Sequence, residues 1–194
     1  MTKSLTLVSR WLAWIGGALI LASAILVSLD VVFRTLFRST VFESFELSSY
    51  AFAIATSFGL AYALVTKAHI RIEVVYNALG LRWRGFLDVL AFASLAAVAL
   101  VLAYWCLQVV LQNGAMGARS NSSLALPLII PQSIWFIGIA WFAIASLLLA
   151  LSGLAWLVRR EFRAIHEALG VGSLQEEIQA SIEPPPIQSR DTAV

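Results

Sequence analysis

Charged residues are scarce in this sequence. Only 12% of the residues are Asp, Glu, Lys or Arg, whereas 60% are hydrophobic, and the mean hydropathy is +0.87. A soluble domain carries roughly 25% charged residues. One small globule cannot hide this excess of apolar residues from water, so the composition predicts a protein that lies in a lipid bilayer.

Residues that bind metals or carry out catalysis are also few. The chain has one cysteine, Cys106, and two histidines, His69 and His166. One cysteine excludes an intrachain disulfide, and these three residues lie too far apart in the sequence to predict a zinc site. The sequence has no glycine-rich phosphate loop. We therefore predict no cofactor, no metal and no enzymatic activity.

The balance of charge is weakly basic. The net charge is +2 and the sequence pI is about 9.0. The basic residues flank apolar runs instead of forming a cluster, which is typical of residues that set membrane orientation. We therefore expect the bilayer, and not a nucleic acid, to be their partner.

Four apolar runs are long enough to cross about 30 Å of hydrocarbon as helices. They cover residues 11–33, 47–66, 86–111 and 134–158, and none of them carries a polar stripe. We predict an all-α integral membrane four-helix bundle over residues 1–165. Residues 166–194 are expected to form a disordered, polar cytoplasmic tail. Although Ala22-Ser23-Ala24 resembles a signal-peptidase site, the first run continues past it, which favours an uncleaved helix.

The distribution of Lys and Arg predicts the topology. If the N-terminus is cytoplasmic, nine basic residues flank the spans on the inner side and three on the outer side. The nine are Lys3, Arg10, Lys67, Arg71, Arg82, Arg84, Arg159, Arg160 and Arg163, and the three are Arg34, Arg38 and Arg119. Both termini are therefore expected in the cytoplasm.

The spans contain two acidic residues, Asp30 and Asp88, near opposite membrane faces. Each has an arginine four residues away, Arg34 and Arg84 respectively, so a local ion pair is the expected role of both. The middle of every span lacks polar residues of the kind that form transport sites, and the sequence shows no internal repeat. This pattern favours a supporting role over transport by the chain alone.

Two features are expected between the spans on the outer side. Thr40 and Glu43 have the spacing of a capping box that opens the second helix, and Glu46 places a negative charge near its positive end. The loop from Asn113 to Pro131 is expected to lie on the outer surface, because Pro127 and Pro131 interrupt any helix there.

Small residues follow one face of the second span. Ala51, Ala55, Gly59 and Ala63 recur at every fourth position. Helices in lipid approach closely where side chains are small. This face is therefore either a contact within the bundle or a docking face for another membrane subunit.

A charged stretch, KAHIRIEVV, follows the second span. Lys67, His69, Arg71 and Glu73 alternate with other residues. As a helix, the stretch would pair His69 with Glu73, and as an extended chain it would place all four on one side. In both cases it predicts a connector at the cytoplasmic surface.

The same stretch carries a family resemblance. The segment FELSSYAFAIATSF followed by GLAYALVTKAHIRIEVV resembles the small membrane subunit of the tripartite ATP-independent periplasmic (TRAP) transporters. The matching residues there are Glu46, Gly59, Ala63, His69, Ile70, Ile72 and Glu73. Arg34 after the first span and LALPLIIP before the fourth also fit, so the resemblance covers about residues 10–158. Glu73 stands where the family often has aspartate.

The resemblance implies a scaffold subunit in the inner membrane of a bacterium. Its partners would be a large TRAP membrane subunit, which holds the transport site, and a periplasmic substrate-binding protein. The transporter would take up an organic acid with sodium. The residues implied as subunit-interface or structural positions are Arg34, Glu46, Gly59, Ala63, His69, Arg71 and Glu73.

Two alternatives remain open at this point. One is an unrelated four-helix accessory or assembly protein. The other is a haem-binding membrane anchor of a redox enzyme, for which His69 and His166 would be the ligands. Neither histidine lies inside an apolar span, where such a haem is normally held.

Overall fold

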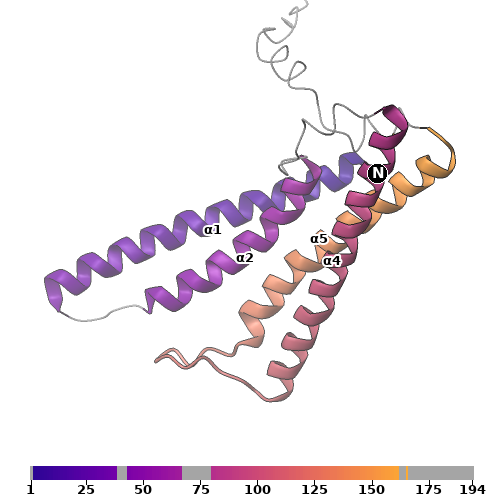
Figure 1. Cartoon of the computed structure of the whole chain (residues 1–194). Helices are drawn as coiled ribbons and strands as arrows, with labels where there is room; N and C mark the ends of the chain where they lie inside the picture. Colours follow the sequence, from indigo (N-terminus) through magenta and orange to yellow (C-terminus); the bar gives the residue numbers. More distant parts are fainter. Residues whose placement is uncertain (1, 39–42, 67–79, 162–164, 166–194) are drawn as a thin grey trace, which may run out of the picture.

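The computed structural model describes residues 2–38, 43–66, 80–161 and 165, and its four long elements are all helices (Figure 1). Each of the four is long and apolar enough to cross a membrane. In this part of the chain the only strand-like pairing is one isolated bridge between Arg119 and Pro127. The predicted all-α, four-helix membrane fold is therefore confirmed.

The four helices are α1 (Thr2–Phe37), α2 (Ser44–Val65), α4 (Leu81–Ala115) and α5 (Ile129–Val158). They extend beyond most ends of the apolar runs, because the polar residues that flank a run can continue its helix. At about 1.5 Å per residue, α1 and α4 are each over 50 Å long. This length exceeds the ~30 Å hydrocarbon core, so both helices either tilt or project into the headgroups.

The helices form two hairpins. Helix α1 packs along α2, α4 packs along α5, and contacts between α2 and α5 join the two pairs. In Figure 1 the hairpins meet at the end that holds the N-terminus and diverge toward the other end. We call these the core end and the loop end, respectively. Helix α1 is the least buried of the four and presents most of its apolar surface outward.

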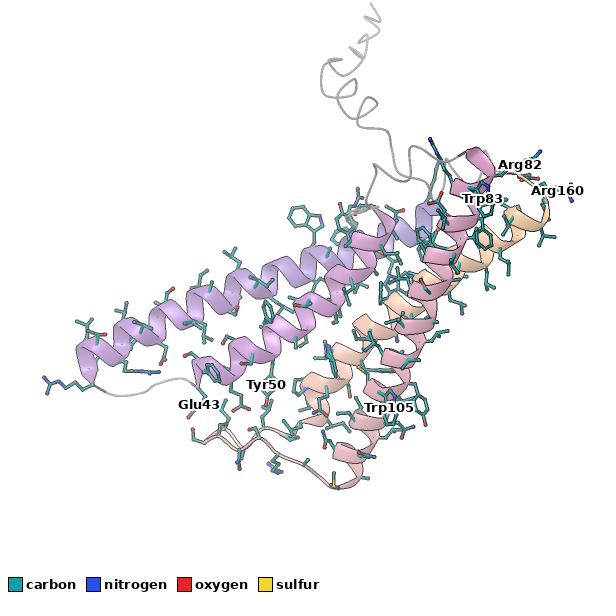
Figure 2. The ribbon with its side chains drawn as sticks, viewed as in Figure 1. Glu43, Tyr50, Arg82, Trp83, Trp105 and Arg160 are labelled. Atoms are coloured by element: carbon teal, nitrogen blue, oxygen red, sulfur yellow. The ribbon has the colours of Figure 1, made fainter. Side chains whose placement is uncertain are left out.

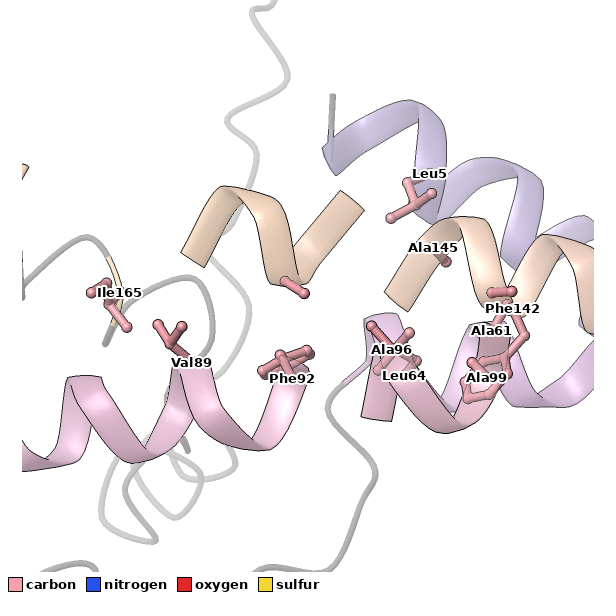
Figure 3. Packing of buried hydrophobic residues seen from close by; sticks show 12 residues of the cluster. Leu5, Ala61, Leu64, Val89, Phe92, Ala96, Ala99, Phe142, Ala145 and Ile165 are labelled. Atoms are coloured by element: carbon pink, nitrogen blue, oxygen red, sulfur yellow. The ribbon is translucent and has the colours of Figure 1, made fainter. Parts of the chain in front are cut away.

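The hydrophobic core lies at the core end (Figure 3). It combines the beginning of α1, the second half of α2, the first half of α4 and the second half of α5. Ile165, which follows α5, is also fully buried in it. The members of the cluster are Leu5, Ala61, Leu64, Val89, Phe92, Ala96, Ala99, Phe142, Ala143, Ala145, Ala150 and Ile165.

Two glycines permit close contact between helices. A Cβ added at Gly16 of α1 would lie 3.0 Å from the backbone oxygen of Ala55 on α2. A Cβ at Gly138 of α5 would lie 2.3 Å from Ser57 Oγ and 2.7 Å from Phe58 Cδ1, both on α2. Helix α2 therefore approaches its two neighbours most closely where they carry no side chain, as is common in membrane bundles.

Helices α4 and α5 end in the same way. After α4, Gly117 has a left-handed φ of 59° and its N–H bonds the Gly114 carbonyl, while Ala118 N–H bonds Asn113. After α5, Arg160 also has a φ of 59°. Its N–H bonds the Leu157 carbonyl, and the Glu161 N–H bonds the Trp156 carbonyl. These are Schellman motifs, which satisfy the last carbonyls of a helix.

Two sequence-based expectations about helix ends are wrong. Glu43 is the N-cap of α2 and makes no capping bond, so it does not occupy the third helical position that a capping box requires. Pro131 lies inside the first turn of α5 and does not interrupt it. A proline is tolerated there because the first N–H groups of a helix have no partner within the helix.

Other expectations fall outside the described residues. These are the surface connector at residues 67–75, the polar tail at 166–194 and Thr40 of the capping box.

Candidate functional site: the polar contacts of the two hairpins

A buried carboxylate joins α1 to α2 at the loop end. Asp30 is 1% exposed, and its Oδ2 accepts a 2.6 Å bond from Arg34 Nη2 and a 2.7 Å bond from Ser44 Oγ. The predicted Asp30–Arg34 pair is therefore confirmed. Ser44, at the start of α2, was not expected from sequence, because its partner is 14 residues away across a loop.

The loop after α4 reaches the beginning of α2. Ser123 donates a hydrogen bond to the Glu43 carboxylate, although the two residues are 80 positions apart. Tyr50 Oη donates to Glu46 Oε1 at 2.7 Å, and the hydroxyls of Ser120 and Ser122 also interact with the Glu46 carboxylate. In Figure 2, Glu43 and Tyr50 both lie beside this loop.

The loop has an internal structure that presents these hydroxyls. Ser120 N–H bonds Leu126 O at 2.9 Å, and Leu128 N–H bonds Ala118 O at 3.0 Å. Arg119 Nη1 donates to Ala125 O at 3.1 Å. The loop is thus a short hairpin that ties the α4–α5 pair to α2 at the loop end. The sequence signal that could have indicated it is the hydroxyl-rich run SNSS opposite an acidic helix start.

The small-residue face of α2 divides into two parts. Ala55 is 5% exposed and packs against Gly16, so this position serves a contact within the chain. Gly59 is half-buried, and among the described residues no side-chain or neighbouring-helix atom lies within 4 Å of the place where its Cβ would be. Ala63 is also half-buried. The face is therefore not one continuous intrachain seam.

A polar contact at the core end was not predicted. Trp141 Nε1 on α5 donates a 3.0 Å bond to Ser9 Oγ on α1, and Ser9 is fully buried. Trp141 lies near the middle of α5 and is half-buried. The Ser9 hydroxyl explains how its N–H is satisfied there. At the loop end, Asn113 Nδ2 of α4 donates to Gln132 Oε1 of α5 at 3.0 Å.

The predicted site residues do not gather in one place. Arg34 and Glu46 both lie at the loop end but bind different partners. Gly59 and Ala63 lie further along α2. His69, Arg71 and Glu73 lie outside the described residues.

Within the four helices, the charged groups lie toward the ends. Helix α5 contains none, α2 contains only Glu46, and α4 contains none after Asp88. Asp88 is 2% exposed and does have an interaction, but its pairing with Arg84 stays a prediction. Within the described ranges no group of three or more His, Cys, Asp or Glu could hold a metal.

These features define a class of protein. The chain is a multi-pass helical membrane protein in which several polar side chains, among them Asp30, Glu43 and Ser9, connect elements that are distant in sequence.

The comparison with protein families identifies the family within this class. Residues 23–155 match the DctQ component of the tripartite ATP-independent periplasmic transporters. The match spans more than half of the chain, so the protein belongs to this family and is a small subunit of a TRAP transporter. No curated protein and no solved structure matches the chain.

Family membership confirms the resemblance seen at residues 10–158. It also excludes the first alternative, an unrelated four-helix accessory or assembly protein, because such a protein would not match this family. The family is a transporter component and not an enzyme family. Both histidines proposed for the haem alternative lie outside the described residues.

Proposed function

We propose that this chain is the scaffold subunit of a TRAP transporter of the bacterial inner membrane, with both termini in the cytoplasm. It supports a large membrane subunit that takes up an organic acid together with sodium. A periplasmic binding protein delivers the acid. The family match over residues 23–155 carries this proposal.

The distribution of polar groups supports a scaffold role. A substrate or sodium site within the bilayer needs polar groups or unwound backbone near the middle of the spans. Helix α5 is 30 residues long without a charge, and the described charges of the other helices lie toward their ends. We therefore place the transport site in the partner subunit.

The pattern of contacts supports the same role. Three separate polar links, Ser44 to Asp30, Ser123 to Glu43 and Trp141 to Ser9, connect elements that are distant in sequence. Such links hold the hairpins in one arrangement at both ends. A rigid frame of this kind suits a subunit that stays still while its partner moves.

The charged stretch at residues 67–73 completes the proposal. Lys67 and Arg71 anchor the chain among anionic headgroups, each contributing about 1 kcal/mol near the surface. His69 and Glu73 contact the large subunit. A desolvated contact of this kind costs about 2–5 kcal/mol when one partner is truncated, whereas an exposed pair contributes roughly 0–1 kcal/mol.

The experiment measures uptake by vesicles and co-purification of the large subunit. We expect sodium-driven uptake only when this chain, the large subunit and the binding protein are all present. Glu73→Gln should lower both co-purification and uptake, with Glu161→Gln, at the exposed end of α5, as the control. Uptake by this chain alone would refute the scaffold role. Normal assembly without uptake in Glu73→Gln would place that residue in the transport step.

A further inference from the structure

A groove runs along the outward face of α1 near the core end. It has a volume of about 520 Å³. It is lined by three small residues, Ala13, Gly17 and Ala18, by Trp14 and Leu21 of α1, and by Tyr62 of α2. Among the described residues, no protein atom occupies the space around the position of a Gly17 Cβ. The groove is thus an apolar space that the described residues leave unfilled.

The length of the groove matches one leaflet of a bilayer. Arg10 lies at its mouth and Leu21 at its far end, so it follows α1 for about 16 Å. Arg10 is also twenty residues, about 30 Å, from the polar Asp30–Arg34 pair at the other end of α1. Arg10 therefore lies at the headgroups of one leaflet, and Leu21 lies near the middle of the membrane.

The mouth of the groove is positively charged. A second hollow of about 280 Å³ shares Arg10 and extends to Lys3. It is also lined by Thr6 and Leu7. In the described part of the chain the only ion pair with known partners is Asp30–Arg34, and neither Lys3 nor Arg10 has an acidic partner. Two cations thus face the headgroup region beside the opening of an apolar channel.

We propose that this groove binds one anionic phospholipid from the leaflet at the core end. Its phosphate contacts Arg10 and Lys3, and one acyl chain lies over Gly17 toward Leu21. Trp14 and Tyr62 flank the chain at the depth where aromatic side chains favour the membrane interface. Basic pockets next to apolar surface are typical sites for anionic headgroups. The proposal depends on membrane insertion and not on the transported substrate.

The test compares two lipids that have identical dioleoyl chains, phosphatidylglycerol and phosphatidylcholine. The purified full-length chain is incubated with an equimolar mixture, and bound lipid is measured by native mass spectrometry. We expect at least fivefold more phosphatidylglycerol than phosphatidylcholine. Arg10→Gln should reduce phosphatidylglycerol binding about fivefold, because one cation near the surface contributes about that factor. Arg82→Gln, at an exposed position on α4, should leave binding unchanged.

A second pair of variants tests the channel itself. Gly17→Leu adds a side chain whose Cβ meets no described protein atom, so the bundle should fold normally while both lipids lose binding. Ala24→Leu, which is exposed on the same helix, is the control. Thermal unfolding checks that both variants fold.

Three results would overturn the proposal. Equal binding of the two lipids, or an Arg10→Gln variant that behaves like Arg82→Gln, would show that no anionic headgroup is recognised. Undiminished phosphatidylglycerol binding by Gly17→Leu would place the lipid elsewhere. Absence of phosphatidylglycerol from the assembly co-purified with the large subunit would mean that the groove is a protein interface.

Discussion

A single methyl group at Gly138 should disturb the contact that joins the two hairpins. A Cβ at this position would lie 2.3 Å from Ser57 Oγ, 2.8 Å from Ser57 Cβ and 2.7 Å from Phe58 Cδ1. Rotation of Ser57 could remove only the first clash. Its Cβ would stay in place, and its hydroxyl already bonds Ile54 O at 2.8 Å. The added methyl must therefore push α5 away from α2.

The magnitude follows from two opposing effects. Overpacking of a tight interior contact costs about 1–3 kcal/mol, and this site is at the upper part of that range because three contacts fall below 3.0 Å. Alanine is a better helix former than glycine by up to about 1 kcal/mol. We expect Gly138→Ala to lower the free energy of unfolding by about 2 kcal/mol.

The assay is reversible unfolding of the purified chain in detergent, with Gly59→Ala as the matched control. Gly59 also lies in a helix, but described protein atoms leave its Cβ position open, so this variant should be neutral or slightly stabilising. Ser57→Gly in the Gly138→Ala background should recover part of the loss, since two of the three clashes disappear. If Gly138→Ala and Gly59→Ala were equally stable, the close approach of α2 and α5 would be refuted.

Two further predictions concern stability in the same assay. Ser9→Ala leaves the buried Trp141 N–H without its acceptor and should cost about 1–3 kcal/mol, whereas Ser28→Ala, an exposed hydroxyl that bonds only its own helix, should cost little. Arg160→Gly should stabilise the chain and Gly117→Ala should destabilise it, each by about 1–2 kcal/mol, because both positions have a φ of 59°. An unchanged melting temperature in both members of this pair would contradict the left-handed helix ends.

Elements that depend on local composition could be predicted from the sequence. Four helices follow from four apolar runs, because lipid requires every backbone polar group to be satisfied within its own segment. The Asp30–Arg34 pair follows in the same way, since residues four apart are neighbours on a helix. Neither inference needs knowledge of how the helices are arranged.

Elements that depend on packing could not be predicted. Ser123 meets Glu43, and Trp141 meets Ser9, only because the hairpins are arranged as they are. Pattern reasoning selected Gly59 as the close-contact glycine of α2, since it stands in a regular row of small residues. The close contacts are instead made through Gly16 and Gly138, neither of which lies on α2. The candidate interface residues from Arg34 to Glu73 stay predictions.

The contrast among the glycines gives a last prediction. At Gly16 and Gly138 the missing side chain admits a neighbouring helix of the same chain. At Gly17 and Gly59 no described protein atom lies within 4 Å of the place where the Cβ would be. Glycine nevertheless weakens a helix by up to about 1 kcal/mol relative to alanine. We infer that something other than the described residues occupies the space beside each of these two glycines. We assign the space beside Gly17 to a lipid and the space beside Gly59 to the large subunit. Gly59→Leu should leave unfolding of the isolated chain unchanged and lower co-purification of the large subunit at least tenfold. Full co-purification would mean that this part of α2 faces lipid.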